Sequence, residues 1–275
     1  MVHGTGKRVK MKPKPQHLGP QYGAQFQDEA VVAAYGRRPP YPDETFTILS
    51  GLVQGAPRRV LDVGCGTGYV ARPLAPLVDS IDAIDLSQPM LAQAKQLPGG
   101  DAANIRWLYG AAETAELTPP YALITAGESL HWLDWSVALP RFAALLMSGG
   151  YLAIVGKRYS DVPWGAELGE LIDRYSTNRE YAPYNIVTEL TERGLFAPQG
   201  EQETAPVTFR QSVSAYVESF HSRNGFSRQR MDPAAAEAFD TAVTHLALSH
   251  HPEGFFEMQV TGHIVWGYPQ KVEML

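Results

Sequence analysis

Three glycines spaced two residues apart, Gly64, Gly66 and Gly68, directly follow a short apolar run at residues 60–63. Glycine is needed where the backbone takes a positive φ, or where a ligand must approach the main chain without meeting a Cβ. The apolar run, the glycines and the amphipathic stretch from Tyr69 form the pattern of a buried parallel strand, a tight turn and a helix. We therefore expect a ligand at the carboxyl end of this strand.

An acidic residue before the glycines separates two kinds of nucleotide site. The dinucleotide-binding fingerprint runs Gly-x-Gly-x-x-Gly, and its glycines bring the backbone against a pyrophosphate. This chain instead reads Asp-x-Gly-x-Gly-x-Gly, with Asp62 two residues before Gly64. A carboxylate there would repel a pyrophosphate but would suit the ammonium of an amino acid. The spacing therefore disfavours a nicotinamide-dependent dehydrogenase.

The string LDVGCGTG at residues 61–68 resembles, at every position, the first motif of the class I S-adenosylmethionine-dependent methyltransferases. The resemblance implies an α/β fold with a doubly wound, mostly parallel, seven-stranded sheet of the Rossmann-like kind. It implies S-adenosyl-L-methionine as the cofactor, and it places at that cofactor the loop residues Asp62, Gly64, Cys65, Gly66 and Gly68. Cys65 is the single cysteine of the sequence, and we interpret it as a small buried residue of the turn rather than as a nucleophile.

The composition of the chain is that of a globular protein with a sizeable core, at 275 residues with 44% hydrophobic and 19% charged residues. Its formal net charge is −6, so we expect a small-molecule substrate and neither nucleic acid nor an anionic membrane as a partner. Residues 1–20 are basic, lack the apolar segment of a signal peptide and are interpreted as a flexible tail. No apolar run approaches the roughly 18 residues of a membrane helix. We expect a cytoplasmic protein that is a monomer or a homodimer.

Short apolar runs alternate with helical stretches from residue 57 to 157, which is typical of a doubly wound sheet. Strands are predicted at 59–63, 81–85, 105–109, 121–126 and 151–155, with two more at 204–210 and 256–266. The pattern divides the chain into a tail (1–20), a cofactor-binding core (21–157), a helical substrate cap (158–253) and a last strand with the C-terminal tail (254–275). Ser87 and Asp134 are predicted to cap two helices of the core.

The second predicted strand ends at Asp85, nineteen positions after Gly66. In a doubly wound fold, an acidic residue about 20 residues past the glycine turn reaches the ribose hydroxyls of the ligand. The alternative is that Asp85 is a turn residue ahead of the next helix. Residues 82–87 also resemble the second methyltransferase motif, which implies that Asp85 and Leu86 contact the cofactor.

After the third strand, the family commonly carries Gly-Asp-Ala-Glu, with its aspartate beside the adenine amino group. This chain has Ala111 in that position, followed by Ala112. The departure weakens the case for recognition of adenine by a side chain, and backbone groups of these two residues would take its place.

The stretch that follows the fourth strand, residues 128–134, resembles the methyltransferase-11 and trans-aconitate methyltransferase-like branch. The resemblance implies that Ala126 contacts the cofactor and that Glu128 and Trp132 face the substrate. His131 is the candidate catalytic residue, either as a general base, which its ordinary pKa of about 6.5 suits, or as a residue that only orients the substrate. Trp132 could equally form a wall of the core.

Upstream of the glycine loop, residues 35–42 resemble the N-terminal segment of the same branch, which folds over the cofactor. This implies cofactor contacts for Tyr35 and Arg38 and a substrate contact for Tyr41. In the cap, His221 and Arg228 are candidates for binding an acidic substrate, since an arginine fork binds carboxylates. Surface charge on a cap helix is the alternative for both. We expect no metal, because His245, His250 and His251 lack the spacing of a metal site.

The sequence thus predicts an enzyme that moves a methyl group from S-adenosyl-L-methionine to an oxygen, nitrogen or carbon atom of a small molecule, possibly one that carries a carboxylate. The alternative is a protein of the same fold that binds this cofactor for regulation or for a reaction other than methyl transfer.

Overall fold

The computed structural model describes residues 13–270. It has a single sheet in the order β3-β2-β1-β4-β5-β8-β6, and β7 pairs with β8 beside this path. The strands are β1 (Arg59–Val63), β2 (Ser80–Asp85), β3 (Ile105–Tyr109), β4 (Tyr121–Gly127), β5 (Leu146–Tyr159), β6 (Phe196–Glu203), β7 (Val207–Ser212) and β8 (Phe255–Pro269). β1 to β5 are parallel, and β8 is antiparallel to β5. The predicted α/β fold with a mostly parallel sheet is confirmed.

The sheet has eight strands where the sequence predicts seven, and the additional strand is β6. β6 pairs with the C-terminal half of β8, from His263 to Pro269, whereas β7 pairs with its N-terminal half, from Phe255 to Val260. The two short strands therefore share one position beside β8, and the sheet keeps seven positions. β6 has a low strand propensity and an irregular register between Pro198 and Gly200. Proline and glycine are tolerated at a sheet edge, which explains why the apolar pattern did not reveal it.

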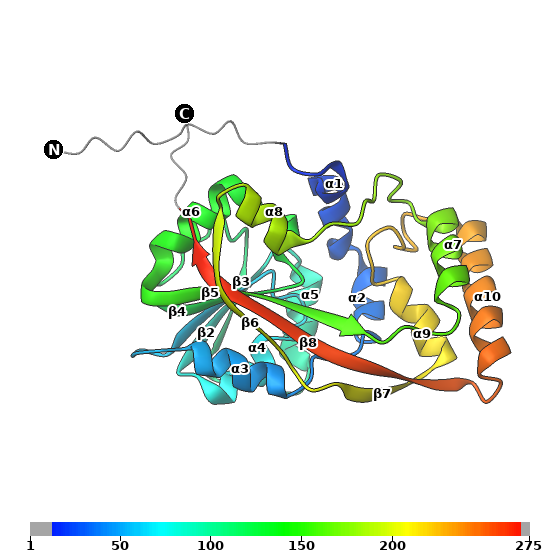
Figure 1. Ribbon diagram of the computed structural model, residues 1–275, viewed down its shortest axis with the longest axis horizontal. Coiled ribbons are helices and arrows are strands. Elements are labelled where there is room, and N and C mark those ends of the chain that lie inside the picture. Colours follow the sequence, from blue (N-terminus) through cyan, green and yellow to red (C-terminus); the bar gives the residue numbers. More distant parts are fainter. Residues whose placement is uncertain (1–12, 271–275) are drawn as a thin grey trace.

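Helices cover both faces of the sheet (Figure 1). One face packs against α3 (Glu44–Leu52), α4 (Ala71–Leu74) with the adjoining turn Ala75–Leu77, and α5 (Gln88–Gln96). The other face packs against α6 (Trp135–Leu145) and α8 (Ile186–Glu192). Ser87 caps α5 by accepting from the N–H of Met90, and Asp134 caps α6 by accepting from the N–H of Ser136, as the sequence predicts.

The cap consists of α7 (Gly165–Tyr175), α9 (Val213–Phe220) and α10 (Pro233–His250), which pack on the extended parts of β7 and β8. Figure 1 shows the long strands β5 and β8 running out of the core and beneath this cap. Within the predicted cap of residues 158–253, α8 and β6 pack with the layers of the core.

An N-terminal segment bridges the core and the cap. It comprises the turn Gln16–Leu18, α1 (Pro20–Gly23), the turn Ala24–Gln27 and α2 (Glu29–Tyr35), and α2 contacts both α5 and α9. His17 and Leu18 are buried, so the predicted flexible tail is wrong for residues 16–20, while residues 1–12 lie outside the described part. Within residues 13–270, no helix is long and apolar enough to cross a bilayer.

Candidate functional site

The loop after β1 takes the left-handed backbone conformation at all three of its glycines, with φ of +62° at Gly64, +54° at Gly66 and +78° at Gly68. A Cβ on Gly64 would lie 2.5 Å from the Cβ of Ser129, so this glycine is required by packing as well as by conformation. Gly66 differs, because the nearest atom to a Cβ there would be the Tyr35 hydroxyl at 3.8 Å. A Cβ at Gly66 would therefore be in ordinary van der Waals contact with the Tyr35 ring, so the positive φ rather than packing requires this glycine.

Asp85 at the end of β2 holds this loop in place. One carboxylate oxygen accepts from the N–H of Gly66 at 2.7 Å, and the other accepts from the N–H of Ser87 at 2.7 Å. Burial raises the pKa of this carboxyl. Beside it Leu86 is 53% exposed, and Tyr109 at the end of the neighbouring strand is 61% exposed. The edge of the sheet next to the loop thus presents a carboxylate and an apolar surface. Ala111 and the buried Ala112 follow β3 at the same edge.

Asp62 is buried in β1 with one oxygen unsatisfied. Thr125 on β4 donates to its Oδ1 at 2.8 Å, whereas Oδ2 has no hydrogen-bond partner among the described residues. Burial raises the pKa of this carboxyl to about 7, although the Thr125 hydrogen bond and the nearby backbone N–H of Ala71 oppose the shift. A buried acceptor without a partner is costly, so a donor at Oδ2 would stabilise the site. Ala126, the neighbour of Thr125, is fully buried.

A small cavity of about 20 Å³ lies between this loop, the N-terminal segment and the ends of β4 and β5. Seven predicted site residues line it, namely Tyr35, Arg38, Tyr41, Asp62, Gly64, Cys65 and Glu128. Four residues that the sequence analysis did not select complete the lining, namely Tyr69, Val70, Gly127 and Lys157. Burial raises the pKa of the Cys65 thiol well above its usual range, which fits a structural residue of the turn.

Comparison with known proteins identifies the fold around this cavity. Residues 60–150, which include the glycine loop, Asp85 and Glu128, match the model of a methyltransferase domain family. This part of the chain is therefore similar to a methyltransferase domain. Among solved structures, the chain is similar to a proposed type II methyltransferase from Anaeromyxobacter dehalogenans, with a TM-score of 0.62. That match covers 85% of this chain and 99% of the other at 21% identity, so it shows the fold alone.

Curated relatives match the methyltransferase domain at higher identity but over less of the chain. An uncharacterized methyltransferase of Mycobacterium tuberculosis is 35% identical over 149 residues, which are 53% of this chain and 58% of the relative. A trans-aconitate 2-methyltransferase of Pseudomonas aeruginosa is 32% identical over 153 residues, covering 48% of this chain and 53% of the relative. The chain thus spans little more than half the length of these relatives.

Lys157, near the end of β5, is the main residue of the cavity that sequence reasoning missed. Its ammonium donates to the carbonyl of Pro39 at 2.8 Å and lies 3.7 Å from the carboxylate of Glu128. It also lies over the rings of Tyr41 and Tyr69, at 4.5 and 5.1 Å from their centroids. Burial lowers the pKa of Lys157 to about 8, and Glu128 opposes that shift. Its place just past the apolar run 151–155 was the available signal, since ligands gather at the carboxyl ends of parallel strands.

Glu128, directly after β4, has a strained backbone conformation. Its φ is +51°, and among residues 13–270 it is the only residue other than glycine with a positive φ. Its N–H donates to the carbonyl of Val155 at 3.0 Å, which holds the strained turn against β5. Strain of this kind costs about 1–3 kcal/mol and clusters at functional sites.

His131 and Trp132 lie in the turn Leu130–Trp132 and belong to an aromatic cluster beside the cavity rather than to its lining. The His131 ring contacts Trp132 and Tyr184, and Trp132 contacts Phe26 of the N-terminal segment. Burial lowers the pKa of His131 to about 3, and Lys14, Arg38 and His17 lower it further. A histidine with this pKa is neutral at physiological pH and a weak base, which favours the orienting role over the general base.

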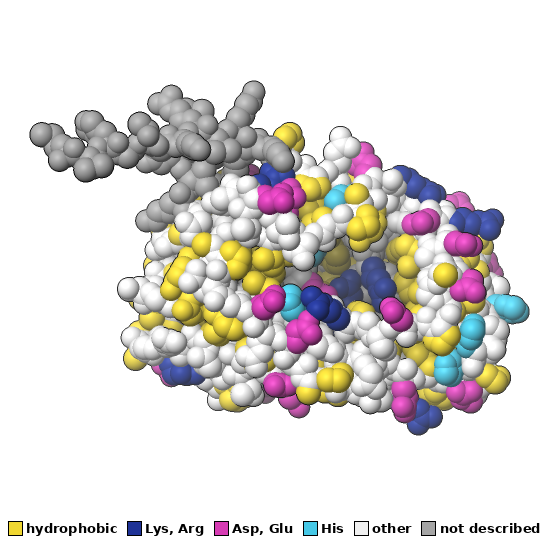
Figure 2. All heavy atoms as spheres, viewed as in Figure 1, with side chains coloured by type: hydrophobic (Ala, Val, Ile, Leu, Met, Phe, Trp, Pro, Cys, Tyr) yellow, Lys and Arg dark blue, Asp and Glu magenta, His cyan; other side chains and the backbone are white. Residues whose placement is uncertain are grey.

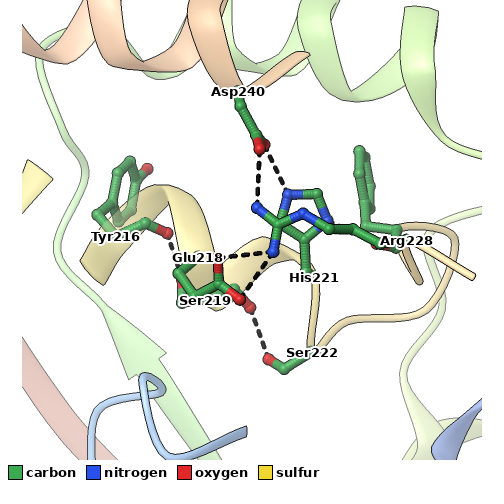
Figure 3. A network of polar contacts seen from close by, with 8 residues as sticks. Tyr216, Glu218, Ser219, His221, Ser222, Arg228 and Asp240 are labelled. Carbon is green, nitrogen blue, oxygen red and sulfur yellow. Dashed lines mark hydrogen bonds and ion pairs between the residues drawn. The ribbon is translucent and has the colours of Figure 1, made fainter. Parts of the chain in front are cut away.

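The structure does not bring His221 and Arg228 into the cavity. Both belong to a network of polar contacts in the cap (Figure 3). The fully buried His221 contacts the Phe226 carbonyl through Nδ1 at 2.8 Å and the Asp240 carboxylate through Nε2 at 2.6 Å. Arg228 forms ion pairs at 2.7 Å with Glu218 and with Asp240. These contacts occupy the groups that would otherwise bind a substrate. Residues 13–270 hold no cluster of three or more His, Cys, Asp or Glu side chains suited to a metal ion.

Proposed function

We propose that this protein transfers a methyl group from S-adenosyl-L-methionine to an oxygen, nitrogen or carbon nucleophile of a small molecule. The observation that carries the proposal is the glycine loop itself, whose three glycines have a positive φ and whose Gly66 N–H donates to the Asp85 carboxylate. The same loop leads into a cavity that contains the unsatisfied Asp62.

The residues around the loop fit the functional groups of this cofactor. The unpartnered Oδ2 of Asp62 suits the ammonium of the methionine part, and Arg38 in the same cavity suits its carboxylate. Asp85 suits the ribose hydroxyls. Leu86 suits the adenine face, and the backbone of Ala111 and Ala112 suits the adenine edge. When bound, the cofactor supplies a methyl group on a sulfonium, which is a good leaving group.

The main task left to the protein is alignment of the acceptor, which contributes about 7–11 kcal/mol to rate enhancement. Tyr41, Glu128 and Lys157 line the cavity, and in this proposal they restrict how a nucleophile approaches. A positioned general base adds about 10²–10⁴-fold, so the transfer does not depend on a dedicated acid–base pair. We further propose that the protein acts in the cytoplasm as a monomer or a homodimer on a small molecule, without nucleic acid or membrane partners, in line with its net charge of −6.

Calorimetry with S-adenosylhomocysteine tests the cofactor assignment. We expect saturable binding, and the Asp85→Ala variant should bind about 2–4 kcal/mol more weakly, because hydrogen bonds to a charged group contribute about 1.5–3 kcal/mol each and do not fully add. Asp101→Ala is the matched control, since Asp101 is exposed in a turn before β3. No binding at millimolar ligand by the folded wild-type protein would overturn the proposal.

A methyl-transfer assay separates catalysis from binding alone. With tritiated S-adenosyl-L-methionine and a panel of small metabolites, we expect label to move to at least one acceptor. Cofactor binding without transfer to any acceptor, in the assay conditions that support a known methyltransferase, would favour the alternative of a cofactor-binding protein with a regulatory role.

A further inference from the structure

Basic side chains gather in a hollow between the core and the cap. Figure 2 shows Lys and Arg side chains deep in this hollow, near the place where Figure 1 has the end of β5, α2 and α9 together. Arg38 follows α2, Lys157 lies in β5, and Arg223 follows α9. Three separate elements thus contribute one cation each to the same region.

Two of the three cations have no acidic partner. The Arg38 guanidinium donates to the Oγ and to the carbonyl oxygen of Ser222, which are neutral acceptors, and it lies over the Tyr35 ring. The Arg223 guanidinium lies over the Phe220 ring, 4.3 Å from its centroid. Among residues 13–270, no carboxylate lies within ion-pair distance of either arginine, whereas Lys157 has Glu128.

The two arginines are close enough to affect one another. The bond from Arg38 to Ser222 sets Arg38 beside the residue that precedes Arg223 in the chain. Burial lowers the pKa of Arg223, and the nearby charge of Arg38 lowers it further. Arg223 in turn contributes to the lowered pKa of Lys157, which lines the cavity. Glu128 acts on both Lys157 and Arg223, so three partly buried cations share one carboxylate, and a negatively charged ligand would relieve their repulsion.

We propose that Arg223, together with Arg38, forms a subsite for an oxyanion, a carboxylate or a phosphate, on the methyl acceptor. This inference rests on the proposed function, because the cofactor's own carboxylate would bind Arg38, and Arg223 is then left without an anion. Arg38 comes from the segment over the glycine loop and is shared between the two ligands. Arg223 comes from the cap, which faces the acceptor, and its planar fork suits bidentate binding of an oxyanion.

The loop that carries Arg223 is held rigidly before any ligand arrives. His221, two residues earlier, is clamped between the Phe226 carbonyl and Asp240, and Arg228 closes the far end of the loop on Asp240 (Figure 3). A second contact from the N-terminal segment, between Asp28 and Ser227, holds the same loop at 2.8 Å. Such pre-organisation reduces the entropy lost when an anion binds.

Calorimetric titration with citrate and with inorganic phosphate tests the subsite, using the full chain with and without saturating S-adenosylhomocysteine. We expect at least one anion to bind the wild-type protein and to bind the Arg223→Gln variant about tenfold or more weakly, while the affinity for S-adenosylhomocysteine stays within about twofold. Arg223→Lys should lie between them, because it keeps the charge and loses the fork. Preference for citrate assigns a carboxylate, and preference for phosphate assigns a phosphate.

Arg210→Gln is the matched control. Arg210 is exposed on β7 and also lies over a phenylalanine ring, 4.9 Å from the centroid of Phe255, so the substitution removes the same charge and a similar contact outside the hollow. Equal anion binding by wild type and Arg223→Gln, or no binding of either anion to wild type, would overturn the subsite. Failure of S-adenosylhomocysteine to bind counts against the proposed function instead, and the titrations without it still decide on the subsite.

Discussion

Two regions beside the site, the turn after β1 and the loop after α9, are stabilised by different interactions. Main-chain geometry holds the first, through glycines of positive φ and two backbone N–H groups bound to Asp85. Side-chain pairs hold the second, through His221, Arg228 and Asp240. The turn after β1 therefore depends on conformations that few substitutions permit, whereas the loop after α9 depends on contacts that can be exchanged.

The N-terminal segment couples these two regions. Asp28 binds both Arg230 and Ser227 of the cap loop, and Arg38 binds Ser222 while lining the cavity. A substitution in the cap can therefore alter the glycine turn through this segment. The size of that effect measures how strongly the two regions are coupled.

The largest effect is expected from Gly64→Ala in the turn. Its φ of +62° is unfavourable for alanine, and the new Cβ would lie 2.5 Å from that of Ser129. We expect a loss of about 2–4 kcal/mol in the free energy of unfolding and weak cofactor binding, measured by urea denaturation and calorimetry. Gly169→Ala, in the interior of α7 with open space around it, should instead stabilise by up to about 1 kcal/mol. An unchanged unfolding midpoint for Gly64→Ala would contradict the packing argument.

A smaller effect is expected from Asp240→Asn in the cap. The change removes the charged acceptor shared by His221 and Arg228, so the cap should lose about 1–3 kcal/mol of local stability. Hydrogen exchange of residues 213–232 should accelerate, while the affinity for S-adenosylhomocysteine should change less than about twofold. Glu237→Gln, at an exposed position on the same helix, is the control. A large loss of cofactor affinity would show that the N-terminal segment couples the two regions strongly.

A third test concerns His131, which belongs to the aromatic cluster beside the cavity. Because burial lowers its pKa to about 3, its protonation does not change between pH 6 and 9. We expect His131→Ala to lower the methyl-transfer rate by about tenfold, by the same factor at every pH in that range, with nearly intact cofactor binding. A rate loss that shrinks at high pH would restore the general-base role.

The smallest effect is the pH dependence due to Asp62, whose pKa burial raises to about 7. If its carboxylate binds the ammonium of the cofactor, affinity for S-adenosylhomocysteine should rise by up to about tenfold from pH 6 to 8. Stability without ligand should follow the opposite trend. The folded state keeps a proton that the unfolded chain releases, so the free energy of unfolding should fall as pH rises from about 4 to 7. Asp62→Asn should remove both dependences, and persistence of either in that variant would exclude Asp62 as its source.

The core strands, the glycine loop and the caps Ser87 and Asp134 were predictable because each is a contiguous pattern with a local cause. β6 was not predictable from the sequence, because an exposed edge strand does not need alternating apolar residues. The roles of His221 and Arg228 were also out of reach. Their acidic partner Asp240 lies 19 and 12 positions away, on a helix whose direction the sequence does not specify.

The sequence by itself determined the mostly parallel α/β core and the composition of its glycine loop. The carboxyl ends of parallel strands lie at one edge of the sheet. Residues that follow the strands therefore meet at that edge, however the other segments pack. Only the tertiary structure decided which cations complete the hollow. Arg38 meets Ser222 across 184 positions, and Lys157 meets Pro39 across 118. No local pattern specifies contacts at such separations, because they depend on how the cap and the N-terminal segment pack on the finished sheet.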